Sequence, residues 1–266
     1  MPENYFKKAI SISRRIEMVG FFPEKIIEFL NRRCPPHNVH TLIFWTKKAD
    51  NLIRHSILRK TILQYDQIFI HFTITGMGNS LLEPGIPSME SSLNLLPDLV
   101  ELCGNTERIR VRFDPIVHFR YQDGTEFSNL CYFKEVIKKV RNSGIKKLII
   151  SWMTNYPKVT KRLKQPGITA LQISPEQRKN EADWIYEYAR KLGMSVSACC
   201  VPGFPVSRCI DGFLLNDLHL GNYKVSTERA EGQRKNCGCT KSWDIGWYNK
   251  CPGGCVYCYA NPAKYV

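Results

Sequence analysis

The stretch NLCYFKEVIKKVRNSGIKKLIISW, residues 129–152, contains the pattern that decides the fold. Residues 129–142 carry apolar side chains at helical spacing, and Asn142-Ser143-Gly144 is a typical signal for the end of a helix. The β-rich run Lys147–Trp152 follows after a short turn and is typical of a buried strand. A helix followed at once by such a strand predicts one unit of an α/β fold.

Units of the same kind extend from this stretch toward both ends of the chain. We predict strands over residues 10–13, 41–46, 67–75, 109–113, 147–152, 169–173 and 195–199, and helices over residues 23–33, 50–63, 88–102, 129–142 and 175–192. The last helix has the clearest start, because Ser174 can cap it and Gln177 completes a capping box. This alternation predicts parallel strands joined by helical crossovers.

Two architectures satisfy such a pattern: an open doubly wound sheet, and a full or partial (β/α) barrel of the TIM-barrel kind. No G-x-G-x-x-G motif follows the first strand, which argues against a dinucleotide-binding open sheet, so we expect the barrel. Residues 1–200 would form the barrel body. Residues 201–266 are rich in Gly, Asn, Pro and Cys and would form an irregular tail that docks at the barrel mouth and completes the active site there.

Charge and hydropathy narrow the class of protein. The 266 residues carry a formal charge of +14, from 38 Lys and Arg against 24 Asp and Glu. A basic surface attracts polyanions, so a nucleic-acid or nucleotide-related partner is one expectation, and a merely solubilising surface is the other. The sequence lacks an apolar run long enough to span a bilayer, and its first residues lack the apolar core of a signal peptide. We therefore expect a cytoplasmic protein with no membrane partner.

The cysteines are the most informative residues. There are eleven, and most of them fall between Cys199 and Cys258. In a reducing compartment such a cluster points to metal rather than to disulfides. Cys251, Cys255 and Cys258 stand at i, i+4 and i+7 in a Gly-rich loop, where three thiolates can hold an iron–sulfur cube and leave one iron open. Zinc is the alternative, although it usually takes four closed ligands.

A second set of thiols precedes this loop. Cys209, Cys237 and Cys239, together with Cys200 or its neighbour Cys199, would supply four ligands for a second, fully ligated cluster. A structural zinc ion held by the same residues is one alternative. Burial of the cysteines as small apolar side chains is another.

The C-x-x-x-C-x-x-C spacing, with Tyr257 before the last cysteine, resembles the cluster loop of radical S-adenosylmethionine (SAM) enzymes. The wider chain resembles the DUF1848 family, whose members look like radical SAM proteins related to the spore photoproduct lyase group. The motifs that carry this second resemblance span nearly the whole chain. They are Ser11-Ile-Ser13-Arg14-Arg15, Phe44-Trp45-Thr46-Lys47, Arg112-Phe-Asp114-Pro115-Ile116, Cys209-Ile-Asp211, Gln233-Arg234, Cys237-Gly-Cys239, Ser242-Trp-Asp244 and the three-cysteine loop.

The resemblance implies an enzyme that holds a [4Fe–4S] cluster on Cys251, Cys255 and Cys258 and cleaves SAM reductively to a 5′-deoxyadenosyl radical. It also implies an external electron donor such as a ferredoxin or flavodoxin. The catalytic residues and the substrate stay unidentified. In radical SAM proteins the cluster loop normally follows the first strand, so a loop near the end of the chain implies a circularly permuted barrel.

Six side chains at the expected strand ends and in the loop are candidates for binding the cofactor. Asp114 could accept hydrogen bonds from ribose hydroxyls and Arg112 could bind a carboxylate, unless the two pair with each other. Tyr257 could pack its ring on the cofactor. The complete set is Tyr257, Asp114, Arg112, Thr46, Lys47 and Arg14.

Two other functions remain open. One is a non-catalytic nucleic-acid-binding protein whose Cys-rich tail is stapled by zinc, which would use the basic surface and the cysteines without catalysis. The other is an electron-transfer protein, which would leave the large β/α body without a purpose.

Overall fold

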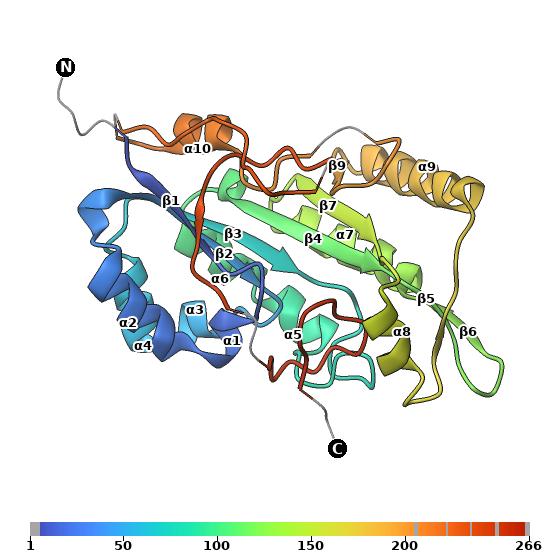
Figure 1. The fold of residues 1–266 in the computed structure, drawn as a ribbon. Helices are drawn as coiled ribbons and strands as arrows, with labels where there is room; N and C mark the ends of the chain where they lie inside the picture. The colour runs from blue at the N-terminus through green and yellow to red at the C-terminus, as the bar shows by residue number, and fades with distance from the viewer. Residues whose placement is uncertain (1–5, 205–206, 222, 235, 248–249, 264–266) are drawn as a thin grey trace.

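The computed structural model of the chain describes residues 6–204, 207–221, 223–234, 236–247 and 250–263. Its main sheet has seven strands in the order β10-β1-β2-β3-β4-β7-β9, and all neighbouring pairs are parallel (Figure 1). These strands are β1 (Lys8–Ile12), β2 (Val39–Thr46), β3 (Ile68–Thr73), β4 (Ile109–Ile116), β7 (Lys147–Trp152), β9 (Ser195–Ala198) and β10 (Trp243–Asp244).

A smaller antiparallel sheet and ten α-helices complete the described part of the chain. The small sheet has the order β6-β5-β8 and consists of β5 (His118–Arg120), β6 (Glu126–Ser128) and β8 (Thr169–Ala170). The helices are α1 (Met18–Phe21), α2 (Pro23–Arg33), α3 (Asp50–Arg54), α4 (Ser56–Ile62), α5 (Met89–Asn94), α6 (Leu96–Cys103), α7 (Phe133–Asn142), α8 (Pro157–Leu163), α9 (Pro175–Lys191) and α10 (Gly212–Leu218).

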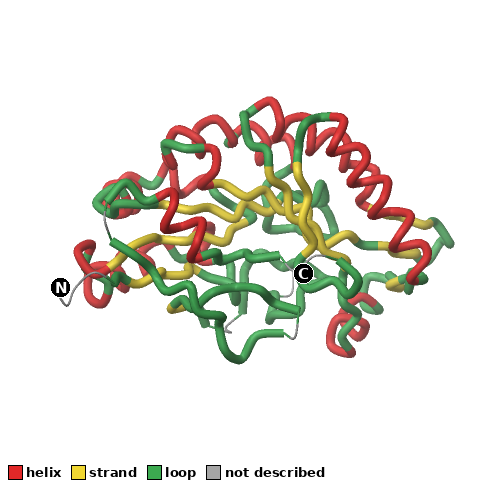
Figure 2. Tube along the Cα trace, turned by 90° about the horizontal axis from the view of Figure 1, so that it is seen from above, coloured by secondary structure: helices red, strands yellow, loops and turns green. Residues whose placement is uncertain are grey.

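The two faces of the main sheet are covered differently. Because successive side chains of a strand point to opposite faces, one set of strand residues packs on helices and the other set does not. Ile10, Phe44 and Phe72 belong to the large core that also contains residues of α2, α4, α6, α7 and α9. Figure 2 shows these two sides of the sheet, with helices along one and mainly loops along the other. We call the side with the loops the inner face.

The tail covers the inner face. Ala9, Ile43 and Ile149 pack there against tail residues that include Ile210 and, on α10, Leu215. The tail also adds an edge strand, since Trp243 of β10 pairs with Ile10 of β1. Burial against the sheet therefore gives this helix-poor segment the apolar contacts that it could not make alone.

The predicted α/β fold with parallel strands is confirmed. The prediction of a full or partial barrel is not confirmed, because the main sheet is open: β10 and β9 lie at its two edges, and the described residues form no pairing between them. The predicted strand over 169–173 is shorter and belongs to the small sheet, where Ala170 pairs with Phe119. The predicted helix over 50–63 is divided at His55, and the one over 88–102 is divided at Leu95. Among the described residues, none of the helices combines the length and the apolar character that crossing a membrane requires.

Candidate active site

The three predicted cluster ligands lie on one short loop, Cys251–Cys258, which we call the cysteine loop. The loop is closed by its own backbone: Cys251 N donates to Asn261 O at 2.7 Å, and Ala263 N donates to Cys251 O at 2.8 Å. Gly254 has a φ of 64°, in the left-handed region that glycine adopts without strain. The three thiols interact electrostatically with one another.

The cysteine loop docks on the segment that follows β3. Gly85 N donates to Gly253 O, and Val256 N donates to Leu82 O, both at 3.1 Å. From the other side, Arg162 of α8 donates to the carbonyl of Cys258 at 2.6 Å. These contacts bring the loop to the carboxyl edge of the parallel sheet, which is where α/β proteins place their chemistry.

A partly buried cation faces the thiols. Lys47, directly after β2, donates to Glu83 at 2.5 Å and to the hydroxyl of Tyr257 at 2.6 Å. Burial alone would lower the pKa of Lys47, but the negative charges of Glu83 and of the thiolates of Cys255 and Cys258 outweigh it and raise that pKa. Burial also raises the pKa of Cys255 well above its usual range, and the charge of Lys47 opposes that rise. Lys47 thus offsets the negative charge that a thiolate at Cys255 would bring.

Glu17 fixes the turn before that cation. Its carboxylate accepts from Thr46 Oγ1 and from Lys47 N, both at 2.7 Å, and from Gly20 N at 3.1 Å. Burial raises the pKa of Glu17, and these hydrogen bonds lower it in part. Glu17 and Glu83 were not predicted from the sequence, because an isolated glutamate carries no local signal that it will be buried.

Polar side chains of the inner face continue from Lys47 across the sheet. The guanidinium of Arg112 pairs with Asp114, and Ser151 at the end of β7 donates to the same carboxylate. Burial would raise the pKa of Asp114, but the charges of Arg112 and Lys47 and these hydrogen bonds lower it. Arg112 also lies over the ring of Trp45, 5.3 Å from its centroid. Asp114 is therefore an ionised, firmly held carboxylate.

The second set of cysteines lies beside Arg112 and forms a closed ring of neighbours. Cys209 Sγ lies 3.7 Å from Cys199 Sγ, and hydrogen bonds join Cys209 to Cys239, Cys239 to Cys237, Cys237 to Cys200, and Cys200 to Cys199. We call these five residues the thiol ring. The bond from Cys239 lowers the pKa of Cys237 to about 7. Cys200 has a φ of 54°, a strained value for a residue other than glycine.

Guanidinium groups face the thiol ring on two sides. Arg112 donates to Cys209 Sγ at 3.2 Å, and Arg234 donates to Cys199 Sγ at 3.7 Å. The pKa values of Cys199 and Cys209 are raised, mainly by neighbouring thiols and by burial, and the charge of Arg112 opposes that rise. Arg234 also interacts electrostatically with Asp114, so the thiol ring and the cysteine loop are linked through Asp114 and Lys47.

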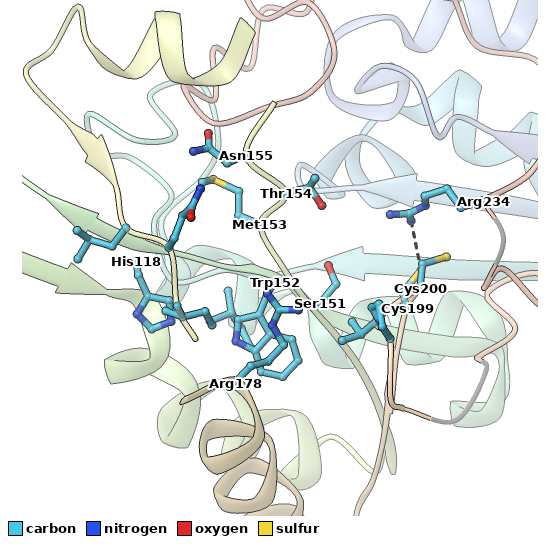
Figure 3. Close-up of a pocket in the computed structure, with 16 residues that line it drawn as sticks. His118, Ser151, Trp152, Met153, Thr154, Asn155, Arg178, Cys199, Cys200 and Arg234 are labelled. Atoms are coloured by element: carbon cyan, nitrogen blue, oxygen red, sulfur yellow. Dashed lines mark hydrogen bonds between the residues drawn. The ribbon is translucent and has the colours of Figure 1, made fainter. Parts of the chain in front are cut away.

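A cavity of about 460 Å³ opens beside the thiol ring, at the carboxyl ends of β7 and β9 (Figure 3). Cys199, Cys200 and Ser151 form part of its wall. The cavity therefore touches the thiol ring, and Ser151 connects it to the carboxylate of Asp114.

One comparison with known proteins gives a family. The sequence over residues 10–260 matches the model of the family described as a domain of unknown function, DUF1848. The chain belongs to the DUF1848 family. No curated protein matches the sequence.

The structure of this DUF1848 member brings together most of the predicted site residues, with corrections to their surroundings. Arg112 and Asp114 pair with each other, which was the alternative to separate contacts with a cofactor. Tyr257 is buried and hydrogen-bonded to Glu83 and Lys47, so its hydroxyl holds the loop in place. Thr46 is engaged by Glu17.

The remaining two predictions concern Arg14 and the choice between two neighbouring cysteines. The guanidinium of Arg14 lies 6.0 Å from the centroid of the Trp45 ring and donates to the side chain of Gln233 at 3.4 Å. Cys199 and Cys200 both belong to the thiol ring, so each of them stays a candidate for the fourth ligand. Across the described ranges, no three His, Cys, Asp or Glu side chains are arranged to hold a single metal ion.

Proposed function

We propose that this DUF1848 chain is a radical SAM enzyme that holds a [4Fe–4S] cluster through Cys251, Cys255 and Cys258. The observation that supports it is one loop with three mutually interacting thiols, opposite a partly buried lysine, at the carboxyl edge of a parallel sheet. Three thiolates are the donor set for a cluster with one open iron. Such a cluster, when bound, supplies the electron that cleaves SAM to methionine and a 5′-deoxyadenosyl radical.

The strand order supports a permuted form of the radical SAM fold. In that fold the cluster loop follows the first strand of a partial barrel. Here the cysteine loop follows β10, which is last in the chain but lies at the sheet edge, next to β1. Read along the sheet from that edge, the loop therefore follows the first strand. The proposed relation to the spore photoproduct lyase group depends on this arrangement.

The residues of the chain have separate roles in the proposal. Lys47 balances the charge of the thiolates, and Glu83 and Tyr257 hold Lys47 in position. Asp114, fixed by Arg112 and Ser151, has lone pairs left for ribose hydroxyls of SAM. The tail over the inner face excludes water from the space where a carbon radical would form.

The thiol ring would hold the second metal group. Its five sulfurs exceed the four that a closed cluster or a zinc ion needs. A cluster that relays electrons from an external donor such as a ferredoxin or flavodoxin is our first choice, and a structural zinc ion that anchors the tail is the second.

Anaerobic reconstitution with iron and sulfide tests the proposal. We expect a brown protein that absorbs near ~400 nm and forms 5′-deoxyadenosine from SAM under reducing conditions. The triple variant Cys251→Ala, Cys255→Ala, Cys258→Ala should lose that product and about four iron atoms per chain, while it keeps any metal of the thiol ring. Cys131→Ala is the matched control, since Cys131 is exposed and distant in sequence from both sets.

The opposite result has a defined meaning. A colourless protein that retains zinc and binds nucleic acid without cleaving SAM would support the non-catalytic alternative. Formation of 5′-deoxyadenosine by the triple variant would show that the cluster ligands are wrongly assigned.

A further inference from the structure

The cavity beside the thiol ring is a defined space with the size of a small-molecule site. Its volume of about 460 Å³ falls within the range of pockets that enclose metabolite-sized ligands. It is lined by residues of β4, β5 and β7, of the segments after β7, β8 and β9, of α9 and of the tail (Figure 3). Rigid elements on several sides make it a preformed site.

The charge of the lining is one-sided. Arg178 and Arg234 both line the cavity, and none of the described residues that line it is an aspartate or glutamate. Within the described part of the chain, neither arginine makes a direct ion pair with a carboxylate. The Nε atom of Arg178 is buried and lacks a hydrogen-bond partner. A buried guanidinium donor without an acceptor is costly, and a bound anion would satisfy it.

The wall next to Arg178 is aromatic and firmly held. Trp152 donates through Nε1 to Glu181 at 2.7 Å, and His118 contacts the same carboxylate at 3.2 Å. Glu181 is therefore behind the wall and orients both rings. Arg178 lies one helical turn before Glu181 on α9, with its guanidinium 6.0 Å from the centroid of Trp152. With Leu171 and other apolar lining residues, this wall suits the flat or apolar part of a ligand.

The cavity is also connected to the cysteine loop. Ser151 lines the cavity and donates to Asp114, and Asp114 interacts electrostatically with Lys47, which faces Cys255 and Cys258. A molecule in the cavity would therefore lie next to the residues to which we assign SAM.

From these observations we infer that the cavity is the substrate site and that its substrate is a small molecule with an anionic group, a phosphate or a carboxylate. The anionic group binds between Arg178 and Arg234. An aromatic or apolar part of the same molecule packs against Trp152. The inference deepens the proposed function by assigning its substrate class. Its test does not require the cluster, because neither of the two arginines nor Trp152 is a proposed cluster ligand.

Three probes that share a benzene ring distinguish the contribution of the anionic group to binding from that of the ring. Phenyl phosphate, benzoate and benzyl alcohol are titrated into the reconstituted protein under anaerobic conditions, and binding is measured by calorimetry. We expect one of the two anions to bind at least about tenfold more tightly than the alcohol, and the tighter one identifies the group as phosphate or carboxylate. Arg178→Gln and Arg234→Gln should each weaken that anion by about tenfold.

Arg190→Gln is the control, because Arg190 is an exposed arginine on the same helix and does not line the cavity. Circular dichroism checks that each variant is folded. Equal binding of the alcohol and the anions, unchanged anion binding in both variants, or no anion binding at about 10 mM would each overturn the inference. The titration is repeated on the triple cysteine variant. We expect the variant to keep its anion binding. If the unmodified reconstituted protein binds the anion but never forms 5′-deoxyadenosine, the proposed function fails and this site stands.

Discussion

The ammonium group of Lys47 lies 2.6 Å from the hydroxyl of Tyr257, and this contact joins the end of β2 to the cysteine loop across more than two hundred residues of chain. Glu83, 2.5 Å from the same nitrogen, completes the unit. The side chain of Glu83 is only 1% exposed, so its charge depends on Lys47 for compensation. The position of the loop and the stability of the protein are therefore coupled through one buried ion pair.

Replacement of Lys47 by methionine tests that coupling. The variant keeps the length of the side chain but leaves Glu83 buried without its cation, so we expect a loss of about 3 kcal/mol in the free energy of unfolding. Chemical denaturation of the reduced protein measures it. The double variant Lys47→Met, Glu83→Gln removes both charges and should recover part of the loss. If the two single losses simply add, the pair is not the unit described here.

His40 should make the protein sensitive to mild acid. Burial and the nearby charge of His219, whose ring centroid lies 4.1 Å away, lower the pKa of His40 from 6.5 to about 4. Between these pH values His40 is protonated in the unfolded chain but neutral in the folded one. The free energy of unfolding therefore falls as the pH drops from 6.5 toward 4. At about pH 5 the cost is about 2 kcal/mol.

Comparison with His40→Asn isolates this effect from other titrating groups. The difference in unfolding free energy between about pH 7 and about pH 5 should be smaller in the variant by about 2 kcal/mol. The same pH dependence in both proteins would mean that His40 is accessible to protons in the folded state.

Gly78 should tolerate no side chain. A Cβ atom at this position would lie 1.8 Å from the carbonyl oxygen of Pro87, which is backbone and cannot rotate away. The segment between them carries Leu82 and Gly85, which hold the cysteine loop. Gly78→Ala should therefore cost about 2 kcal/mol and lower the iron content after reconstitution. Gly124→Asn, at a left-handed position with open space around it, is the control and should keep the iron.

Ser174 should matter for stability but not for the metal sites. Its hydroxyl accepts from Gln177 N at 3.0 Å and caps α9. Ser174→Ala should cost about 1 kcal/mol in thermal or chemical unfolding, and Ser174→Asp should restore it. Iron content and SAM cleavage should stay unchanged. A loss of iron would mean that α9 supports the cluster in a way that no contact described above explains.

The strands of the main sheet can be predicted from the sequence, because parallel strands that are buried on both faces are continuous apolar runs. The points at which the predicted helices are divided cannot be predicted in the same way. His55 adopts an extended backbone and caps the next helix with its own ring, and Pro97 starts a new helix after Leu95, so two apparently continuous patterns are each divided. Both breaks depend on backbone geometry that apolar periodicity does not report.

Some residues of the candidate site could likewise be predicted from the sequence, and others could not. Cysteine spacing is sufficient to group Cys251 with Cys255 and Cys258, since they lie on one loop. The thiol ring joins β9 to two separate parts of the tail, and its membership was predicted from composition alone. Glu17 and Glu83 escaped prediction because their burial arises from contacts between distant segments. The two-residue β10 has too little sequence for any period to show.

The pairing of β10 with β1 has a consequence for folding during synthesis of the chain. Ser11 and Asp244, which bond across this pair at 2.7 Å, are separated by 233 positions, so the ribosome makes the first strand long before its edge partner exists. Until then β1 is a bare edge, open to pairing with other chains. The cysteine loop follows β10 in the chain, so we expect insertion of the cluster that we propose there to be a late step of maturation.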